Sequence, residues 1–410
     1  MRIILISVYI FLNLLMFGMC GYIYIVWSHY WKNRNKYLFN NTEKHTKHQD
    51  KHSLVEYFDD NVTNGPPSRK ISYKPSFPNA TQYGVNYLAD RRMLVEYKRK
   101  IIIKLRSVLF EESSLQRKQK ENPYDVEFLE PMHHHDMSPD KLLCELRDAM
   151  RGQVKLLRRE DVGDADIGKV MDDRRPLLEK GEHFDKCAIV SNAGALRYSY
   201  LGSEIDKHDL VLRFNHAPTI DYEVDVGSKT TIRILNSQVA SKPEFDFTTS
   251  SLYKNVKILI WDPMPFRETI KYWLENPEHN FFRSFIKYKD QHPNSTVSIV
   301  NPEDLWKLWL YLQQHTYSKL RLNPPSSGFL GLALLLPHCS TVNMFEFIPS
   351  HRMTSTCHYF SPLIDPTCTT GVWHPLAAEK LLMLSLNTAS DETVFNKGYV
   401  TIKGYSNLSC

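Results

Sequence analysis

Three asparagines each follow a short apolar run in the middle of the chain. They are Asn192 after residues 187–191, Asn215 after residues 209–214, and Asn236 after residues 230–235. An amide side chain both donates and accepts hydrogen bonds, so three of them together suit a sugar or a nucleotide better than a bare ion. Each asparagine could equally end a strand or form a turn without binding anything, and that alternative stays open.

A second group of polar residues opens a predicted helix. The segment Asn323-Pro-Pro-Ser326-Ser327-Gly328 precedes the apolar run 329–336. The first N–H groups of a helix have no partner within the helix, and its N-terminus attracts anions. The segment therefore predicts a phosphate or carboxylate site at Ser326, Ser327 and Gly328. A capped helix buried in the core, without a ligand, fits the same residues.

A histidine near the C-terminus is the candidate for acid–base chemistry. His374 precedes Pro375, which suits the first position of a helix, so the imidazole would lie beside the helix cap. A side chain that titrates near neutral pH is a natural general base. A structural capping role is the alternative. Cys357 and Cys368 are close enough in sequence to form a disulfide that would stiffen the approach to His374.

The elements that must position these residues alternate between strands and helices. Besides the three apolar runs, strands are predicted at 256–261, 296–300 and 342–347. Helices are predicted at 141–150 and 306–312, and a third contains the apolar run 329–336 and ends at Cys339. Strands that alternate with helices indicate a parallel α/β sheet, in which ligands bind outside the carboxyl ends of the strands. We therefore expect all three asparagines to face one crevice.

The overall charge argues against a nucleic-acid partner. The formal net charge of the 410-residue chain is only +5, and the sequence carries no RNA- or DNA-binding motif.

The N-terminus predicts a membrane anchor. Residues 3–27 are almost entirely apolar and long enough to span a bilayer as a helix, although a cleaved signal peptide is the alternative. By the positive-inside rule, the basic residues that follow this segment favour a cytoplasmic location for the rest of the chain. Candidate glycosylation sites and the even number of cysteines after Cys20 favour a lumenal body instead. The candidate glycosylation sites are Asn40, Asn61, Asn79, Asn294 and Asn407.

The predicted organisation is therefore of type II. It has a cytoplasmic tail at 1–2, an anchor at 3–27, a lumenal stem at 28–125 and a catalytic body at 126–410. Within the stem, residues 91–110 predict a basic amphipathic helix. This helix could bind a membrane surface or a partner, or it could pack on the body or within the stem.

Four segments, taken together, resemble the eukaryotic sialyltransferases. Residues 187–238 resemble the large sialylmotif, and LRFNHAPT, DVGSKTTIR and NSQ within them are similar to the β-galactoside α-2,6 branch. NPPSSGFLG at 323–331 resembles the small motif. His358-Tyr359-Phe360 resembles the third motif, although Ser361 departs from it. His374 and Glu379, with Lys380 after them, resemble the very small motif. The resemblance covers about 135–410.

This resemblance implies a variant GT-A-like α/β fold with a mostly parallel twisted sheet between helices. It implies transfer of sialic acid from CMP-sialic acid to the 6-hydroxyl of terminal galactose, without a cofactor or metal, by a Golgi enzyme with its catalytic domain in the lumen. Asp164-Ala165-Asp166 is a carboxylate pair of the kind that could hold a metal, but it lies in a polar loop before the sheet.

The resemblance also assigns residue roles. His374 would be the general base, and Gln238 and Glu278 are candidate galactose contacts. His358 and Trp373 replace tyrosines of many α-2,6 relatives, and His358, if protonated, could bond the leaving phosphate. Donor contacts are implied at Asn192, Asn215, Asn236, Ser326, Ser327, Gly328, His358, Thr369, Trp373 and Lys380.

The implied disulfides are Cys144–Cys410, Cys187–Cys339 and Cys357–Cys368, of which the second would join the first strand to the end of the small-motif helix. Transfer with another linkage or acceptor (α-2,3 to galactose, or α-2,6 to N-acetylgalactosamine) and a catalytically silent sugar-binding protein are the alternatives.

Overall fold

The computed structural model describes residues 91–116, 122–128, 137–371 and 373–410. The predicted tail, the anchor at 3–27 and most of the predicted stem lie outside the described residues, as do Asn40, Asn61 and Asn79. Among the described helices, none is both long and apolar enough to cross a membrane.

A single seven-stranded sheet organises the described part of the chain, with the order β5-β4-β3-β2-β1-β6-β7. Neighbouring strands are parallel except for the β6–β7 pair, which is antiparallel. This confirms the predicted mostly parallel sheet. The strands are β1 Phe184–Val190, β2 Leu210–Phe214, β3 Ile232–Asn236, β4 Lys257–Trp261, β5 Val297–Ile299, β6 Cys339–Phe345 and β7 Tyr399–Lys403.

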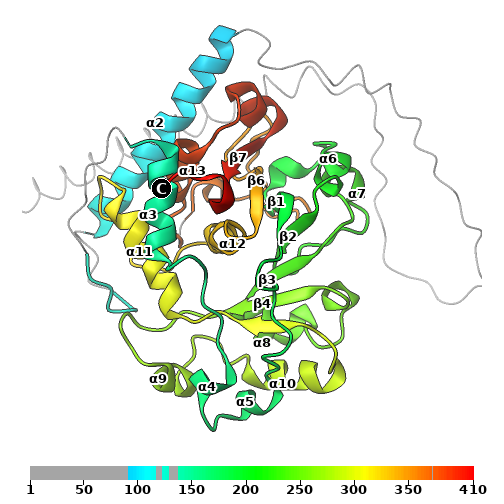
Figure 1. Cartoon of the computed structure of the whole chain (residues 1–410). Coiled ribbons are helices and arrows are strands. Elements are labelled where there is room, and N and C mark those ends of the chain that lie inside the picture. Colours follow the sequence, from blue (N-terminus) through cyan, green and yellow to red (C-terminus); the bar gives the residue numbers. More distant parts are fainter. Residues whose placement is uncertain (1–90, 117–121, 129–136, 372) are drawn as a thin grey trace, which may run out of the picture. The chain divides into compact units, whose positions relative to one another are not determined.

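Helices cover both faces of this sheet (Figure 1). The longer ones are α2 Arg91–Gln116, α3 Pro139–Ala149, α10 Phe282–Gln291, α11 Glu303–Gln314, α12 Ser327–Leu335 and α13 Leu376–Leu386. The short ones are α4 Arg159–Val162, α5 Asp166–Val170, α6 Gly202–Asp206, α7 Glu223–Val226, α8 Ser237–Ser241 and α9 Ile270–Glu275.

Burial on both faces explains why the central strands read as continuous apolar runs rather than as alternating ones. In β1, Ile189 joins the core beneath α12, whereas Ala188 and Val190 join the core beneath α6 and α7. Leu212 of β2 packs on the same side as Ile189, and Val211 packs on the other side.

Helix α2, which the sequence places in the stem, packs against α13 (Figure 1). Its buried face consists of Ile101, Leu105 and Leu109, and the hydroxyl of Tyr97 donates to the carbonyl of Ser350 at 2.5 Å. Of the two interpretations of this segment, the structure therefore displays packing on the body. The boundary predicted at residue 126 stays a prediction.

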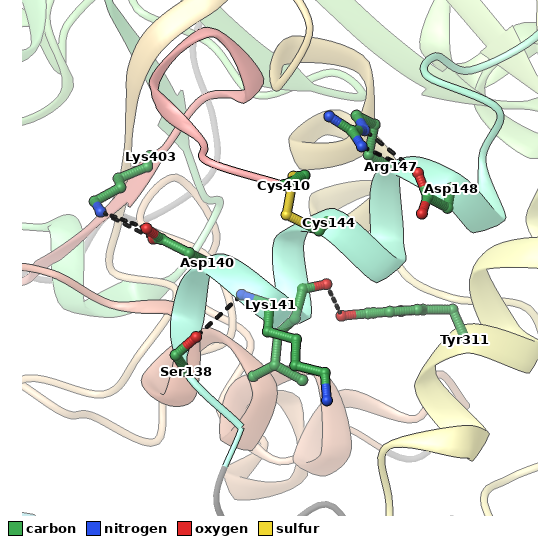
Figure 2. The surroundings of a disulfide bond; sticks show 10 residues. Ser138, Asp140, Lys141, Cys144, Arg147, Asp148, Tyr311, Lys403 and Cys410 are labelled. Carbon is green, nitrogen blue, oxygen red and sulfur yellow. Dashed lines mark hydrogen bonds and ion pairs between the residues drawn. A yellow bond between two sulfur atoms is a disulfide. The ribbon is translucent and has the colours of Figure 1, made fainter.

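The C-terminus is tied to α3 (Figure 2). Ser138 caps α3 through the amide of Lys141, with Pro139 at the first turn, as the sequence predicts. Cys144 in this helix forms a disulfide with Cys410. The hydroxyl of Tyr311 donates to the carbonyl of Leu142, which joins α11 to α3.

The other disulfides are Cys187–Cys339 and Cys357–Cys368, so the three pairs that the resemblance implies are present. One detail is wrong. Cys339 does not end the small-motif helix; it is the first residue of β6, three residues after the end cap of α12. Because β6 pairs directly with β1, the Cys187–Cys339 disulfide joins two neighbouring strands rather than a strand and a helix.

Candidate active site

A cavity of about 360 Å³ opens at the carboxyl ends of the central strands. Strands β2 to β5 lie on one side of β1, and β6 and β7 lie on its other side, so the strand order reverses between β1 and β6. Parallel sheets bind ligands at such a switch point. The strand-end residues that line the cavity are Ser191 and Asn192 after β1, Phe214 at the end of β2 with Asn215 after it, and Glu346 and Phe347 after β6.

Nearly all the residues predicted to contact the donor meet at this cavity, together with the predicted base. Those lining it are Asn192, Asn215, Ser326, Ser327, Gly328, His358, Thr369, Trp373, His374 and Lys380. The gathering of segments as distant as 192 and 380 is thus observed, whereas the role of each residue stays a prediction.

Asn236 is not among the residues that line this cavity, so its predicted contact with the donor stays a prediction. Its side chain caps α8 by accepting a hydrogen bond from the amide of Val239 at 2.9 Å. Asn215 supports it, because the Asn215 Oδ1 atom accepts from the amide of Asn236 at 3.0 Å.

Asn192 is held against the segment that follows Cys357. The carbonyl of Asn192 accepts from the amide of Tyr359, and Ala193 forms an antiparallel bridge with His358. A Cβ atom on Gly194 would lie 2.2 Å from the carbonyl oxygen of Thr356, so only glycine permits this approach. The Oδ1 atom of Asn192 is buried and has no hydrogen-bond partner in the described structure. It is therefore an acceptor available to a ligand hydroxyl or amide.

The N-terminus of α12 is already occupied by a carboxylate of the protein. Glu379 is fully buried and accepts from both the amide of Ser326, at 2.7 Å, and its hydroxyl, at 2.5 Å. Ser326 Oγ also caps the helix through the amide of Phe329. Ser326 therefore works mainly inside the protein, and the first-turn amides that remain for a ligand are those of Ser327 and Gly328.

Gly328 packs so closely that a Cβ atom there would lie 2.4 Å from the Phe347 ring. The hydroxyl of Ser327 accepts a hydrogen bond from the indole N–H of Trp261 at 2.8 Å. Because this leaves the hydroxyl proton of Ser327 available, the side chain can still donate to a ligand in the cavity.

The geometry around His374 suits proton abstraction. Its Nδ1 atom lies 2.8 Å from the carbonyl oxygen of Pro324. A carbonyl only accepts, so Nδ1 carries the proton and Nε2 has its lone pair free. Burial lowers the pKa of His374 to about 4, which keeps the imidazole neutral near pH 7. Pro375 is the N-cap of α13 rather than its first residue, a shift of one position from the prediction.

Trp373 flanks the imidazole, with the two ring centroids 4.5 Å apart and the rings nearly perpendicular. Its carbonyl accepts from the side-chain amide of Asn323 at 2.8 Å, and its side chain is 39% exposed. The segment before α12 therefore holds both Trp373 and His374, through Asn323 and Pro324 respectively.

Lys380 reaches the cavity from the inside of α13. It is buried, donates to the carbonyl of Phe347 and lies 4.9 Å from the centroid of that ring. Burial lowers the pKa of Lys380 to about 8, while the neighbouring carboxylates Glu379 and Glu346 oppose the shift. The ammonium group therefore remains largely protonated at neutral pH and places positive charge beside the cavity.

His358 differs from the expectation. Burial, and after it the proximity of His216, lowers the pKa of His358, so the ring is neutral near pH 7 in the unliganded protein. The protonated form that the sequence suggested is not favoured, and His358 would donate to a phosphate as a neutral imidazole. Its ring is stacked on Phe360 at 5.1 Å between centroids.

The two residues predicted to contact galactose do not line the cavity. Gln238 is half-buried in α8, and Glu278 is exposed in the loop after α9. The backbone of Glu278 is nevertheless fixed, because its amide donates to the buried carboxylate of Asp262 at 3.0 Å. The indole of Trp273 donates to the same carboxylate.

Several lining residues were not predicted from the sequence, among them Ser191, Glu346, Thr354 and Thr356. A signal existed for Glu346, which is a charged residue inside the predicted strand 342–347; in the structure β6 ends at Phe345, directly before it. It was missed because only the strand order reveals that β6 lies next to β1.

The carboxylates of the Asp164-Ala165-Asp166 segment are exposed, and Asp166 pairs with Lys169 at the start of α5. Neither aspartate lines the cavity. Among the described residues, one grouping of His, Cys, Asp or Glu has the spacing of metal ligands, and two of its members, Cys357 and Cys368, are joined in a disulfide.

Residues 165–390 match the family model of glycosyltransferase family 29 (sialyltransferase). The chain belongs to this family. The family resemblance inferred from the sialylmotifs is thereby confirmed, and the cavity is that of a sialyltransferase-family domain.

Curated relatives carry the name β-galactoside α-2,6-sialyltransferase 2. The Xenopus tropicalis protein is 40% identical over 291 residues, which cover 70% of this chain and 56% of that protein. The Danio rerio protein is 45% identical over 279 residues (67% and 53%), and the Homo sapiens protein is 41% identical over 276 residues (67% and 52%). The chain thus spans about half the length of the curated relatives it matches.

A solved mammalian sialyltransferase aligns with 68% of this chain and 94% of its own, at 19% identity and a TM-score of 0.33. The TM-score lies below 0.5, so this alignment carries no argument about the chain.

Proposed function

We propose that this chain transfers sialic acid from CMP-sialic acid to the 6-hydroxyl of a terminal galactose, with inversion and without a metal. The observation that carries the proposal is the fixed, neutral His374 at the switch-point cavity, with Nδ1 bonded to Pro324 and Nε2 free. Family membership supplies the reaction class, and the relatives of about 40% identity are named for α-2,6 transfer to β-galactosides.

In the proposed step, Nε2 of His374 takes the proton from the galactose 6-hydroxyl. The oxygen forms a bond to the anomeric carbon of sialic acid, and the bond from that carbon to the CMP phosphate breaks, so CMP leaves with the electron pair. The amides of Ser327 and Gly328, together with Lys380, would stabilise the negative charge that develops on the phosphate.

Around the donor, Asn192 would offer its unpartnered Oδ1 atom, while Asn215, His358 and Thr369 would form the walls. Trp373 would stack on a sugar beside the base. CMP carries a single phosphate, so the cation and the amides named above can balance its charge without a metal. Exhaustive treatment with EDTA is therefore expected to leave the rate unchanged, and loss of activity that added Mn²⁺ restores would contradict this part.

Gln238 and Glu278 are retained as proposed acceptor contacts, although they lie outside the cavity. The carboxylate of Asp262 fixes the backbone of Glu278 in the loop after α9. Conservative substitution of either residue is expected to raise the KM for the acceptor without changing donor affinity.

The test of the function is the reaction itself. The full chain is incubated with CMP-sialic acid and Galβ1-4GlcNAc, CMP release is followed, and the linkage of the product is read by NMR. An α-2,6 linkage is expected. An α-2,3 product, or transfer only to N-acetylgalactosamine, would replace the proposed specificity. CMP-sialic acid binding without transfer would point to a silent sugar-binding protein.

We also propose that the chain is a type II protein of the Golgi membrane, anchored by residues 3–27, with a stem at 28–125 and a lumenal catalytic body at 126–410. Asn294 and Asn407 are exposed and thus accessible to glycosylation. Expression in animal cells should yield a protein whose mass falls on treatment with an N-glycosidase. Accessibility of the body to protease in intact microsomes would contradict the topology.

A further inference from the structure

Two neighbouring tyrosines are exposed in a backbone conformation that bulky residues rarely adopt. Tyr198 has a φ of 62° and Tyr200 a φ of 58°. Their side chains are 70% and 56% exposed, so no burial of the rings compensates for this conformation. Left-handed backbone at non-glycine residues costs about 1–3 kcal/mol and persists only where the surroundings enforce it.

A single buried carboxylate enforces the conformation. Asp225 in α7 accepts hydrogen bonds from the amide of Tyr198 at 2.8 Å and from the amide of Tyr200 at 3.0 Å. Helices α6 and α7 lie side by side (Figure 1), and a Cβ atom on Gly202 would lie 1.9 Å from the carbonyl oxygen of Glu223. The two rings are therefore presented to solvent from a rigid support.

A third tyrosine and an arginine complete the surface. The guanidinium of Arg197 lies 5.2 Å from the ring centroid of Tyr198 and 4.8 Å from that of Tyr222. We name Arg197, Tyr198, Tyr200 and Tyr222 the tyrosine platform. It combines flat apolar rings with phenol and guanidinium groups that can form hydrogen bonds.

The tyrosine platform adjoins the candidate active site. Nη1 of Arg197 donates to the carbonyl of Tyr359, the neighbour of the cavity-lining His358. Tyr198 follows the cavity-lining Ala195 by three residues, which limits the separation of their Cα atoms to about 11 Å. A ligand that extends out of the cavity on this side can therefore reach the rings.

From this geometry we propose that the tyrosine platform binds a sugar ring of the acceptor glycan beyond its terminal disaccharide. This inference rests on the proposed function. A pyranose presents C–H groups on its face and hydroxyls at its rim, which matches aromatic faces edged by phenol and guanidinium groups. Because Asp225 fixes the backbone of Tyr198 and Tyr200 in advance, little backbone entropy is lost on binding.

A second copy of the chain is the competing occupant, because tyrosine and arginine are both enriched in protein–protein interfaces. The experiment below separates the two occupants.

The test uses the full chain and two acceptors with the same terminus: Galβ1-4GlcNAc, and a desialylated biantennary N-glycan. The double variant Tyr198→Asn/Tyr200→Asn removes both rings, while asparagine tolerates the left-handed backbone, so the fold should be retained. The matched control is Phe110→Asn, which removes an aromatic ring that is 64% exposed on α2.

For the double variant we expect the KM for the biantennary glycan to rise about five- to tenfold, since an aromatic contact is worth about a factor of two to ten. The KM for the disaccharide and kcat should not change, and the control should match the wild type with both acceptors. Equal effects on both acceptors, or no effect on either, would overturn the proposal.

Direct titration of the biantennary glycan, without donor, separates this inference from the proposed function. If the wild type transfers nothing but binds the glycan, and the double variant binds it several-fold more weakly, the platform assignment stands while the function fails. Absence of binding by the wild type overturns the platform. A sedimentation coefficient that falls in the double variant, with glycan binding unchanged, assigns the surface to a second copy instead.

Discussion

The stretch from Cys187 to Gln238 and the stretch from Asn323 to Lys380 both line the cavity, but they use their polar groups differently. In the first stretch, polar side chains mostly hold the backbone. Arg233 donates to the carbonyls of Asn215 and Ala217 at 2.8 and 3.0 Å, and Asn236 caps a helix. In the second stretch, segments far apart in sequence hold one another, through Pro324 with His374 and Ser326 with Glu379.

The first stretch therefore supports the cavity structurally, whereas the second stretch carries the reactive group. The buried arginines of the first stretch, Arg213 and Arg233, are bonded to carbonyls, and burial lowers the pKa of each to about 10. They stiffen the strand ends and offer little to a ligand. The second stretch supplies the neutral imidazole and its orientation, so its reactivity depends on contacts between α12 and α13.

The largest effect is expected from breaking the contact between those two helices. Glu379→Ala leaves the amide and hydroxyl of Ser326 buried without their carboxylate partner, which should lower the free energy of unfolding by about 2–5 kcal/mol. Denaturant unfolding measures this, with the exposed Glu303→Ala in α11 as the control. A variant as stable as the control would mean that the α12–α13 link is not what holds the second stretch together.

A smaller effect distinguishes the asparagines of the first stretch. Asn236→Ala removes a helix cap and should cost about 0.5–2 kcal/mol of stability, with CMP affinity unchanged. Asn215→Ala, at the cavity wall, should weaken CMP binding several-fold. Calorimetric titration with CMP, alongside thermal unfolding, checks both variants. Weaker CMP binding by Asn236→Ala would show that Asn236 belongs to the donor site, as Asn215 does.

The smallest effect concerns pH. Because the neutral imidazole is the reactive form and burial lowers the pKa of His374 to about 4, kcat/KM should stay level as the pH falls below 6.5 and decline only near 4. A pH profile measured within the range in which the protein stays folded checks this. A decline centred at 6.5 would mean that the imidazole titrates as if exposed to water.

Much of the fold could be predicted from local patterns, because the central strands are buried on both faces and so read as short apolar runs. The sialylmotifs then identified most of the residues that gather at the cavity. The side chain of Asn236 caps α8, which was one of the alternatives left open for each asparagine, and sequence alone could not choose between them. Cys339 was misplaced because the stop signal at Pro337, which disfavours helical backbone at the residue before it, was passed over.

The least predictable features are contacts between distant residues. No local pattern indicates that the carbonyl of Pro324 accepts from His374, or that Glu379 occupies the N-terminus of α12, since these contacts join residues 50 and 53 positions apart. The left-handed backbone of Tyr198 and Tyr200 is equally hidden, because tyrosine is not a residue that signals such a turn.

The most direct test of the central claim compares His374→Ala with the wild type in two measurements on the same preparations. These are the affinity for CMP and the rate of sialic acid transfer to Galβ1-4GlcNAc. Loss of the base should lower the rate about 10²–10⁴-fold, with CMP affinity unchanged, because the donor site is built from other residues. Transfer at a near-normal rate in His374→Ala would contradict the account.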